Sequence, residues 1–296
     1  MLQARKQTTP HSRVPSRSSA RRLGAGGRTR PRREDNASMT AFRNPLRPKL
    51  QAGQATLGFW VTLESATVTE IAAEAGVDWI VVDMEHGCLS YRDALDHIRA
   101  AKGSDLAVIV RVPTTTVDTV KRALDLGAHG VLLPLIRTAE ELRAGFGHAR
   151  YPLTGQRGLG GERAVRWGAA VESYVACAND ETMVIPVIET ADAIANIDAI
   201  LDVPGLEAIF FGPSDLSQSL GHMAVWEGPG VADMILRTAA KATERGIANG
   251  VIGTSPEDIA RRQEQGFRMI GLGSDAGLLL RHLKRAVEAC RPGALA

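Results

Sequence analysis

Two carboxylates follow two short apolar runs in the middle of this chain. Glu189 ends the run at residues 184–188, and Asp215 comes just after the run at residues 208–211. Between the runs, residues 191–201 place isoleucine and leucine at helical spacing, so the expected order is strand, helix, strand. Because parallel strands end at the same edge of a sheet, we expect both carboxylates to face one crevice. Two converging carboxylates suit a hard divalent cation such as Mg²⁺, although ordinary loop caps would have the same residue types.

Other polar or aromatic residues stand at the ends of predicted strands. They are Trp60, Asp83, Glu85, His86, Arg111, Ser274 and Asp275. Trp60 either fills the end of the sheet or lines a site, and His86 is either a solvated loop residue or a catalytic one. Arg111 ends an apolar run, where a charge is costly without a partner, so it has a structural partner or binds a substrate carboxylate. The residue types alone leave these alternatives open.

The elements that position these residues form a regular alternation. The predicted strands cover residues 57–63, 79–84, 106–112, 130–136, 183–188, 208–211, 247–252 and 268–272. The predicted helices cover residues 68–74, 91–101, 117–126, 139–150, 191–201, 231–245, 256–265 and 276–289. Eight strand–helix units with nearly all-apolar strands predict a single α/β domain, a closed (β/α)8 TIM barrel. An open doubly wound sheet is the weaker alternative, because no glycine-rich phosphate-binding turn opens the first helix.

One segment interrupts the alternation. Residues 152–179 are too long for an ordinary connection, and glycine and arginine crowd residues 155–163. This composition predicts a loop. Long insertions in a regular barrel often act as lids or binding loops, so we expect this segment to be one of these.

Charge divides the chain into two parts. Residues 1–38 are rich in Arg and Ser and poor in large apolar residues, so we predict a disordered extension before a barrel domain at 39–296. The extension is a transit peptide, a basic interaction arm, or sequence upstream of a true start at Met39. The remainder of the chain is net acidic, which gives no support for nucleic-acid binding.

Cysteine usage and hydropathy indicate the compartment. Cys88, Cys177 and Cys290 are odd in number and far apart, which is typical of reduced thiols in a cytoplasmic protein. No apolar run approaches the ~20 residues that a membrane span needs. We therefore predict a cytoplasmic protein that binds neither membrane nor nucleic acid.

Five motifs together resemble the HpcH/HpaI aldolase family. They are residues 58–60 (GFW), 82–87 (VDMEHG), 110–113 (VRVP), 187–190 (VIET) and 212–217 (GPSDLS). The likeness preserves their order and spacing and touches every unit of the barrel. It implies a metal-dependent class II pyruvate aldolase, similar to 4-hydroxy-2-oxoheptanedioate aldolase and 2-dehydro-3-deoxyglucarate aldolase. Such an enzyme reversibly cleaves a 4-hydroxy-2-oxo acid to pyruvate, or a close 2-oxo acid, and an aldehyde.

The resemblance assigns catalytic and metal-binding roles to five residues. Glu189 and Asp215 correspond to the ligands of a divalent ion, which is Mg²⁺, Mn²⁺ or Co²⁺. Arg111 corresponds to the residue that holds the pyruvate moiety. His86 corresponds to the histidine that transfers protons, and Asp125 to its acidic partner.

The resemblance also indicates how the substrate is bound. Trp60 corresponds to the aromatic residue of the pyruvate pocket, and the segment around Gly212 and Ser214 corresponds to the contact with the pyruvate carboxylate. One position departs from the family, because Val187 stands where many relatives have Gln. This exchange removes a polar contact near the metal and leaves the two ligands in place.

The residues themselves are consistent with this chemistry. No lysine stands at a predicted strand end, so the chain offers no Schiff-base nucleophile there. A divalent cation bound by the 2-oxo and carboxylate oxygens of pyruvate would spread the developing charge instead. A base with a pKa near neutrality is also needed, and His86 fits that requirement.

Two other functions remain as alternatives. The first is a citrate-lyase-β-like or malyl-CoA-lyase-like enzyme that cleaves a CoA thioester, which the acidic body of the chain disfavours. The second is a barrel that binds a 2-oxo acid without converting it, for which a base at His86 would be unnecessary.

The resemblance finally implies a homo-oligomer. Relatives are often hexamers in which neighbours exchange the last helix. The leucines of the 276–289 helix, Leu278, Leu279, Leu280 and Leu283, suit such docking, although packing against the chain's own barrel would produce the same pattern.

Overall fold

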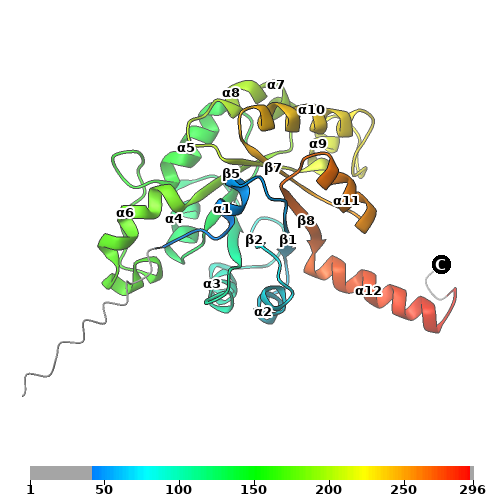
Figure 1. The fold of residues 1–296 in the computed structure, drawn as a ribbon, viewed down its shortest axis with the longest axis horizontal. Helices are drawn as coiled ribbons and strands as arrows, with labels where there is room; N and C mark the ends of the chain where they lie inside the picture. The colour runs from blue at the N-terminus through cyan, green and yellow to red at the C-terminus, as the bar shows by residue number, and fades with distance from the viewer. Residues whose placement is uncertain (1–41, 294–296) are drawn as a thin grey trace, which may run out of the picture. The chain divides into compact units, whose positions relative to one another are not determined.

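The computed structural model describes residues 42–293, which form a closed barrel of eight parallel strands (Figure 1). The strands pair in sequence order, and β1 closes on β8. Their bounds are β1 Thr56–Val61, β2 Trp79–Asp83, β3 Ala107–Arg111, β4 Gly130–Leu133, β5 Met183–Ile188, β6 Ala208–Phe211, β7 Ala248–Ile252 and β8 Met269–Ser274. The predicted (β/α)8 barrel is therefore confirmed, strand by strand.

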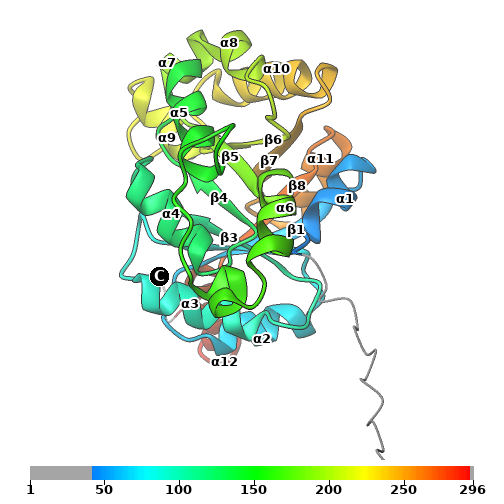
Figure 2. The same ribbon diagram turned by 90° about the vertical axis from the view of Figure 1, so that its left-hand side faces the viewer.

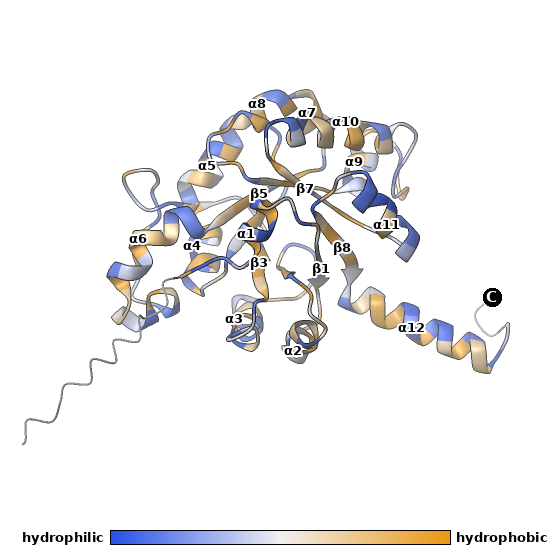
Figure 3. Cartoon of the chain, viewed as in Figure 1, coloured by the Kyte–Doolittle hydropathy of each residue, from blue (hydrophilic) through white to orange (hydrophobic). Residues whose placement is uncertain are grey.

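The strands carry apolar side chains on both faces, because one face lines the barrel interior and the other packs against the helices. Inside the barrel, the ring of Phe210 lies 4.9 Å from that of Trp60 and 6.1 Å from that of Trp79, measured between ring centroids. Gly58 leaves room for this cluster, since a Cβ added there would lie 2.2 Å from the Trp79 ring. Figure 3 shows hydrophobic residues along the strands and hydrophilic ones on the outer faces of the helices.

Helices surround the strands, as Figures 1 and 2 show from two directions. Their bounds are α1 Leu46–Gln51, α2 Thr67–Glu74, α3 Tyr91–Ala100, α4 Val117–Asp125, α5 Ala139–Ala149, η1 Arg163–Gly168, α6 Val171–Glu181, α7 Ala191–Ala195, α8 Ile197–Leu201, α9 Pro213–Ser219, α10 Val231–Glu244, α11 Pro256–Glu264 and α12 Asp275–Cys290. Several begin with the expected capping residues. Ser90 and Asp93 form a capping box at α3, and the Ser255 side chain accepts from the Asp258 amide at α11.

The structure corrects the prediction of a loop at 152–179. Part of that segment is the 3-10 helix η1, and residues 171–181 form α6. The glycine-rich composition of residues 155–163 led to the error, whereas the following residues supply an amphipathic face. Tyr174 and Ala178 on that face are buried and pack with Tyr151. Only tertiary contact makes such a short helix stable.

Three further elements differ from expectation. The predicted 191–201 helix breaks at Asn196 into α7 and α8. Helix α9 begins directly after Gly212, where no helix was predicted. Helix α1 was not predicted, and its buried Leu46 packs with Trp79 and Met183 inside the barrel.

Two features of the chain bear on its surroundings. Within the described residues, no helix is both long and apolar enough to cross a membrane. The predicted extension at residues 1–38 and the proposed start at Met39 lie outside the described residues. Helix α12 projects from the end of β8, and Leu279, Leu280 and Leu283 on it are more than half exposed (Figure 1).

Candidate active site

A small pocket lies at the carboxyl ends of the strands, where barrel enzymes hold their substrates. Its volume is about 100 Å³. Its lining includes Trp60, Arg111, Glu189, Gly212, Ser214 and Asp215. The barrel therefore brings together six of the residues that the sequence singled out, from four different strand ends.

Glu189 follows β5 and is almost fully buried, at 3% exposure. Its Oε1 accepts a hydrogen bond of 2.7 Å from the Leu135 amide. Burial raises the pKa of the Glu189 carboxyl to about 7, and the nearby carboxylates of Glu85 and Asp215 act in the same direction. The three carboxyl groups of Glu189, Glu85 and Asp215 therefore repel one another when all are ionised.

Asp215 lies in the first turn of α9, where Pro213 occupies the first helical position. The side-chain Nε2 of Gln218 donates to Asp215 Oδ1 over 3.1 Å. Between β6 and α9, Gly212 passes close to Glu189: a Cβ added to Gly212 would lie 2.8 Å from Glu189 Oε2. The absence of a side chain at Gly212 is what lets the two carboxylates share one pocket.

Arg111 ends β3 and is held by two acids at the end of the neighbouring strand β2, Asp83 and Glu85. Its Nε donates to Asp83 Oδ1 over 2.9 Å, and its Nη2 donates to Asp83 Oδ2. Glu85 Oε2 lies 3.0 Å from Nη1 as an ion pair, but it has no hydrogen-bond partner. The two bonds to Asp83 fix the guanidinium plane, and Nη1 has an ion-pair contact with Glu85 but no hydrogen bond to it.

The partners of Arg111 were not identified from the sequence. A signal was nonetheless present, since Asp83 and Arg111 end adjacent strands and pair directly in register. Burial raises the pKa of Glu85, an effect that the Arg111 charge partly offsets. Arg111 is therefore the structural centre of this group of charged side chains.

His86 and Asp125 are not brought together within the described residues of one chain. The His86 ring is exposed, and its Nε2 lies 3.7 Å from Glu85 Oε2. Asp125 ends α4, which runs back from the strand ends to the opposite face of the barrel. Its Oδ1 instead accepts from the buried Arg157 over 2.8 Å. A pairing of His86 with Asp125 therefore does not occur inside a single barrel.

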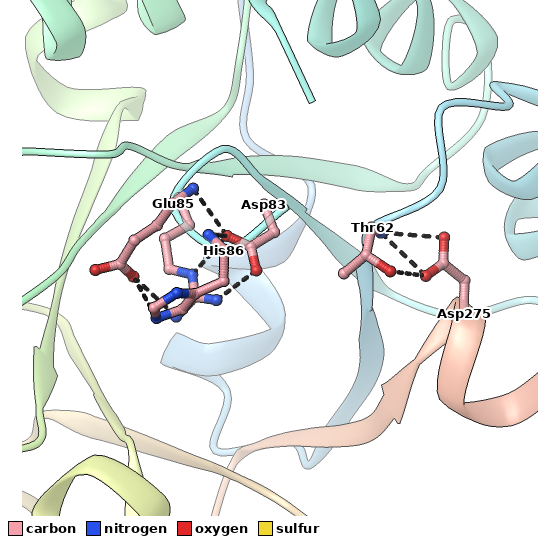
Figure 4. Close-up of polar contacts among 6 residues, drawn as sticks. Thr62, Asp83, Glu85, His86 and Asp275 are labelled. Carbon is pink, nitrogen blue, oxygen red and sulfur yellow. Dashed lines mark hydrogen bonds and ion pairs between the residues drawn. The ribbon is translucent and has the colours of Figure 1, made fainter. Parts of the chain in front are cut away.

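Ser274 and Asp275 have structural contacts. The Ser274 side chain caps α12 by accepting from the Gly277 amide. Asp275 accepts hydrogen bonds from the backbone and side chain of Thr62 (Figure 4). It also accepts one from the Leu63 backbone amide. These bonds tie the segment after β1 to the start of α12.

The residues present fit a divalent cation held by two protein ligands. Among the described residues, no group of three or more His, Cys, Asp or Glu side chains is arranged to hold a metal ion. Glu189 and Asp215 supply two carboxylates, and Glu85 adds a third negative charge nearby. A hard cation that keeps most of its coordination positions for substrate and water suits such a set.

Comparison with known proteins identifies the family of this chain. The profile of the HpcH/HpaI aldolase/citrate lyase family matches residues 56–282. The chain is 37% identical over 242 residues to 4-hydroxy-2-oxovalerate aldolase of Novosphingobium aromaticivorans, covering 79% of this chain and 89% of that protein. It is 36% identical over 232 residues to 2-dehydro-3,6-dideoxy-6-sulfogluconate aldolase of Pseudomonas putida, covering 78% and 91%.

A solved structure matches both the fold and the sequence. The crystal structure of an HpcH/HpaI aldolase/citrate lyase family protein from Burkholderia cenocepacia J2315 has a TM-score of 0.79 at 32% identity, covering 84% of this chain and 99% of that one. The barrel, the pocket at its strand ends and these relatives define a carbon–carbon lyase of the aldolase type. The chain belongs to the HpcH/HpaI aldolase/citrate lyase family, which is known for divalent-metal-dependent class II aldolases.

Proposed function

We propose that the protein reversibly cleaves a 4-hydroxy-2-oxo acid to pyruvate, or a close 2-oxo acid, and an aldehyde. The observation that carries this proposal is the single pocket shared by Glu189, Asp215 and Arg111. Its volume of about 100 Å³ suits a three-carbon donor. The named relatives, which include hydroxypyruvate/pyruvate aldolase of Roseobacter denitrificans at 33% identity, support the same reaction class.

Glu189 and Asp215 are the proposed ligands of Mg²⁺, Mn²⁺ or Co²⁺. The ion supplies Lewis-acid stabilisation of the charge that develops on the 2-oxo oxygen. Glu189 suits this role because its carboxylate is buried beside other acids, so a cation relieves an unfavourable charge. The Leu135 amide holds Oε1 in place, which restricts how the carboxylate presents itself.

Arg111 is the proposed anchor for the charged oxygens of the 2-oxo acid. Asp83 occupies its Nε and one Nη2 hydrogen, and Glu85 forms an ion pair with Nη1 without a hydrogen bond, so the second Nη2 hydrogen and the Nη1 hydrogens are the ones proposed to bind substrate. Trp60 and the backbone around Gly212 and Ser214 complete the proposed donor pocket. The apolar part of the lining, which includes Trp60, Leu132 and Phe210, lowers the local polarity and so strengthens these charge-assisted hydrogen bonds.

His86 is the proposed base that moves the proton of the 4-hydroxyl group. It follows Glu85 at the end of β2, where an approaching substrate can reach its exposed ring. No lysine lines the pocket among the described residues, which supports enolate stabilisation by metal and arginine over a Schiff base.

We propose that the active form is a homo-oligomer, with a hexamer as the expected size. The exposed leucines of α12 support this, because a single chain leaves them in water. The position of Asp125 also supports an oligomer. Asp125 lies on the face opposite His86 and lines an open cavity of about 310 Å³, where a second copy of the chain can reach it. The catalytic pairing of Asp125 with His86 then joins two copies of the chain.

The decisive experiment measures pyruvate release from a panel of 4-hydroxy-2-oxo acids. Treatment with EDTA should abolish the activity, and Mg²⁺, Mn²⁺ or Co²⁺ should restore it. His86→Ala should lower kcat strongly while metal binding persists, whereas His148→Ala on α5, which neither lines the pocket nor lies on α12, should behave as the wild type. Undiminished turnover by His86→Ala would remove His86 from the mechanism. Release of a CoA product, or binding of pyruvate without turnover, would instead favour one of the two alternative functions.

A further inference from the structure

A second cavity of about 410 Å³ adjoins the donor pocket at the barrel mouth. The two share Trp60, Trp226 and Ile252 as a common wall. His86 lines the second cavity and not the first. Because the proposed base must reach the hydroxyl group formed from the aldehyde carbonyl, the larger cavity is where the aldehyde part of the substrate fits.

Charges in this second cavity are unevenly balanced. Its charged and titratable lining residues are Asp83, His86 and Arg281. Asp83 is neutralised by its two hydrogen bonds from Arg111. Arg281 has no carboxylate partner among the described residues; its one hydrogen bond there is a long one, 3.4 Å from Nη2 to the Leu272 carbonyl. The cavity therefore offers one uncompensated positive charge.

The Arg281 guanidinium is positioned by two glycines. A Cβ added to Gly273 would lie 3.1 Å from its Nη2, and one added to Gly277 would lie 3.6 Å from its Nη1. Ser274, whose side chain caps α12, fixes the start of the helix that carries Arg281. The guanidinium therefore rests against bare backbone at the cavity, with most of its donors unused.

The hydroxyl groups in the lining do not compete for this charge. Thr62 donates to Asp275, and Thr254 donates to Asp258. Their oxygens remain as acceptors for hydroxyl groups of a ligand, while an anionic group can be satisfied by Arg281. The expected ligand is thus a polar chain with a negative charge at the end distant from its carbonyl.

We propose that Arg281 determines specificity by binding the anionic terminal group, such as a carboxylate, of the acceptor aldehyde. This inference rests on the proposed aldolase function and adds to it the chemical class of the aldehyde. Arg281 does not touch the reacting atoms. Its contribution is a charge-assisted hydrogen bond that anchors the far end of the acceptor.

The test compares two acceptors of equal length, 4-oxobutanoate with a terminal carboxylate and butanal with a terminal methyl group. Aldol formation with pyruvate is measured for the wild type and for Arg281→Gln. We expect the wild type to prefer 4-oxobutanoate. Arg281→Gln should reduce the kcat/KM for 4-oxobutanoate relative to that for butanal by about tenfold or more. The change should appear mainly as a higher KM for 4-oxobutanoate.

Two companion variants separate recognition from a structural effect. Arg281→Lys keeps the charge and should recover part of the preference. Arg285→Gln, one turn further along α12 and exposed, should leave the ratio unchanged. Equal loss with both acceptors in Arg281→Gln would overturn the inference, since that is the result of general damage to the site.

NMR can monitor the exchange of the pyruvate methyl hydrogens in D₂O, catalysed by the wild type. This measurement separates a failure of the proposed role of Arg281 from a failure of the proposed aldolase function. This exchange requires the donor pocket and the metal but no aldehyde. A wild type that exchanges these hydrogens yet prefers butanal contradicts only the role of Arg281. A wild type that neither exchanges them nor forms an aldol with either acceptor contradicts the proposed function and this inference together.

Discussion

Replacement of Gly212 by alanine should disable the metal site without unfolding the barrel. The added Cβ would lie 2.8 Å from Glu189 Oε2 and 2.9 Å from Glu189 Cβ. Carbon atoms pack best at about 3.5–4.0 Å, so the Glu189 side chain must move by roughly 0.5–1 Å. A displacement of about 1 Å costs about 10²-fold in rate when it disturbs a catalytic group, which corresponds to about 2.7 kcal/mol.

The assay for this variant is pyruvate release at several Mg²⁺ concentrations, together with a thermal unfolding curve. We expect kcat/KM to fall about 10²-fold and the Mg²⁺ requirement to rise, because Glu189 is displaced as a ligand. Gly147→Ala in α5 is the matched control, since its Cβ would meet only Gln156 Nε2 at 4.0 Å. Normal activity and normal Mg²⁺ dependence in folded Gly212→Ala would refute the assignment of Glu189 to the metal.

Three further predictions concern buried charges. Arg157→Leu should lower the free energy of unfolding by about 1.5–3 kcal/mol in urea titrations, because it removes the charge-assisted hydrogen bond from the buried Arg157 to Asp125, whereas loss of the exposed Arg143 ion pair should not be measurable. Arg111→Lys should reduce kcat/KM by about 10²-fold or more in the pyruvate assay, because lysine cannot form the two parallel bonds of the guanidinium. Burial lowers the pKa of the His129 imidazole from 6.5 to about 4, because the folded protein favours the neutral ring. The free energy of unfolding is therefore at its full value above pH 6.5 and decreases as the pH falls towards 4. Since His129 is partly exposed, we expect the free energy of unfolding to fall by about 1–3 kcal/mol between neutral and acidic pH. Urea titrations at the two pH values should show a smaller fall for His129→Asn than for the wild type.

Some features of the protein could be predicted from the sequence because they depend on local pattern. Apolar runs of four to six residues separated by amphipathic segments identify buried parallel strands and their covering helices. The strand ends then follow directly, and with them the positions of Glu189, Asp215 and Arg111. Parallel strands end at one edge, so these side chains had to meet.

Helix content between strands was harder to predict. The segment at 171–181 has a weak apolar face, and its helix forms because Tyr174 and Ala178 pack against Tyr151 and neighbouring residues. Such contacts join residues far apart in the chain. Local composition, dominated here by the glycines upstream, does not report them.

The partners of charged groups depend on the tertiary structure. The sequence indicated that Arg111 needs a partner, while the register of β2 against β3 decided that the partner is Asp83. In the same way, His86 and Asp125 were both identified from the sequence, but the direction of α4 carries Asp125 to the opposite face.

The chain order and residue types determined the barrel and the inventory of groups at its mouth. The closed sheet decided which groups touch, because distances across a barrel depend on strand register and helix direction, neither of which a linear pattern encodes. The second cavity illustrates this most clearly. It combines Trp60 from β1, Thr254 after β7 and Arg281 from α12, and no spacing in the sequence relates the three.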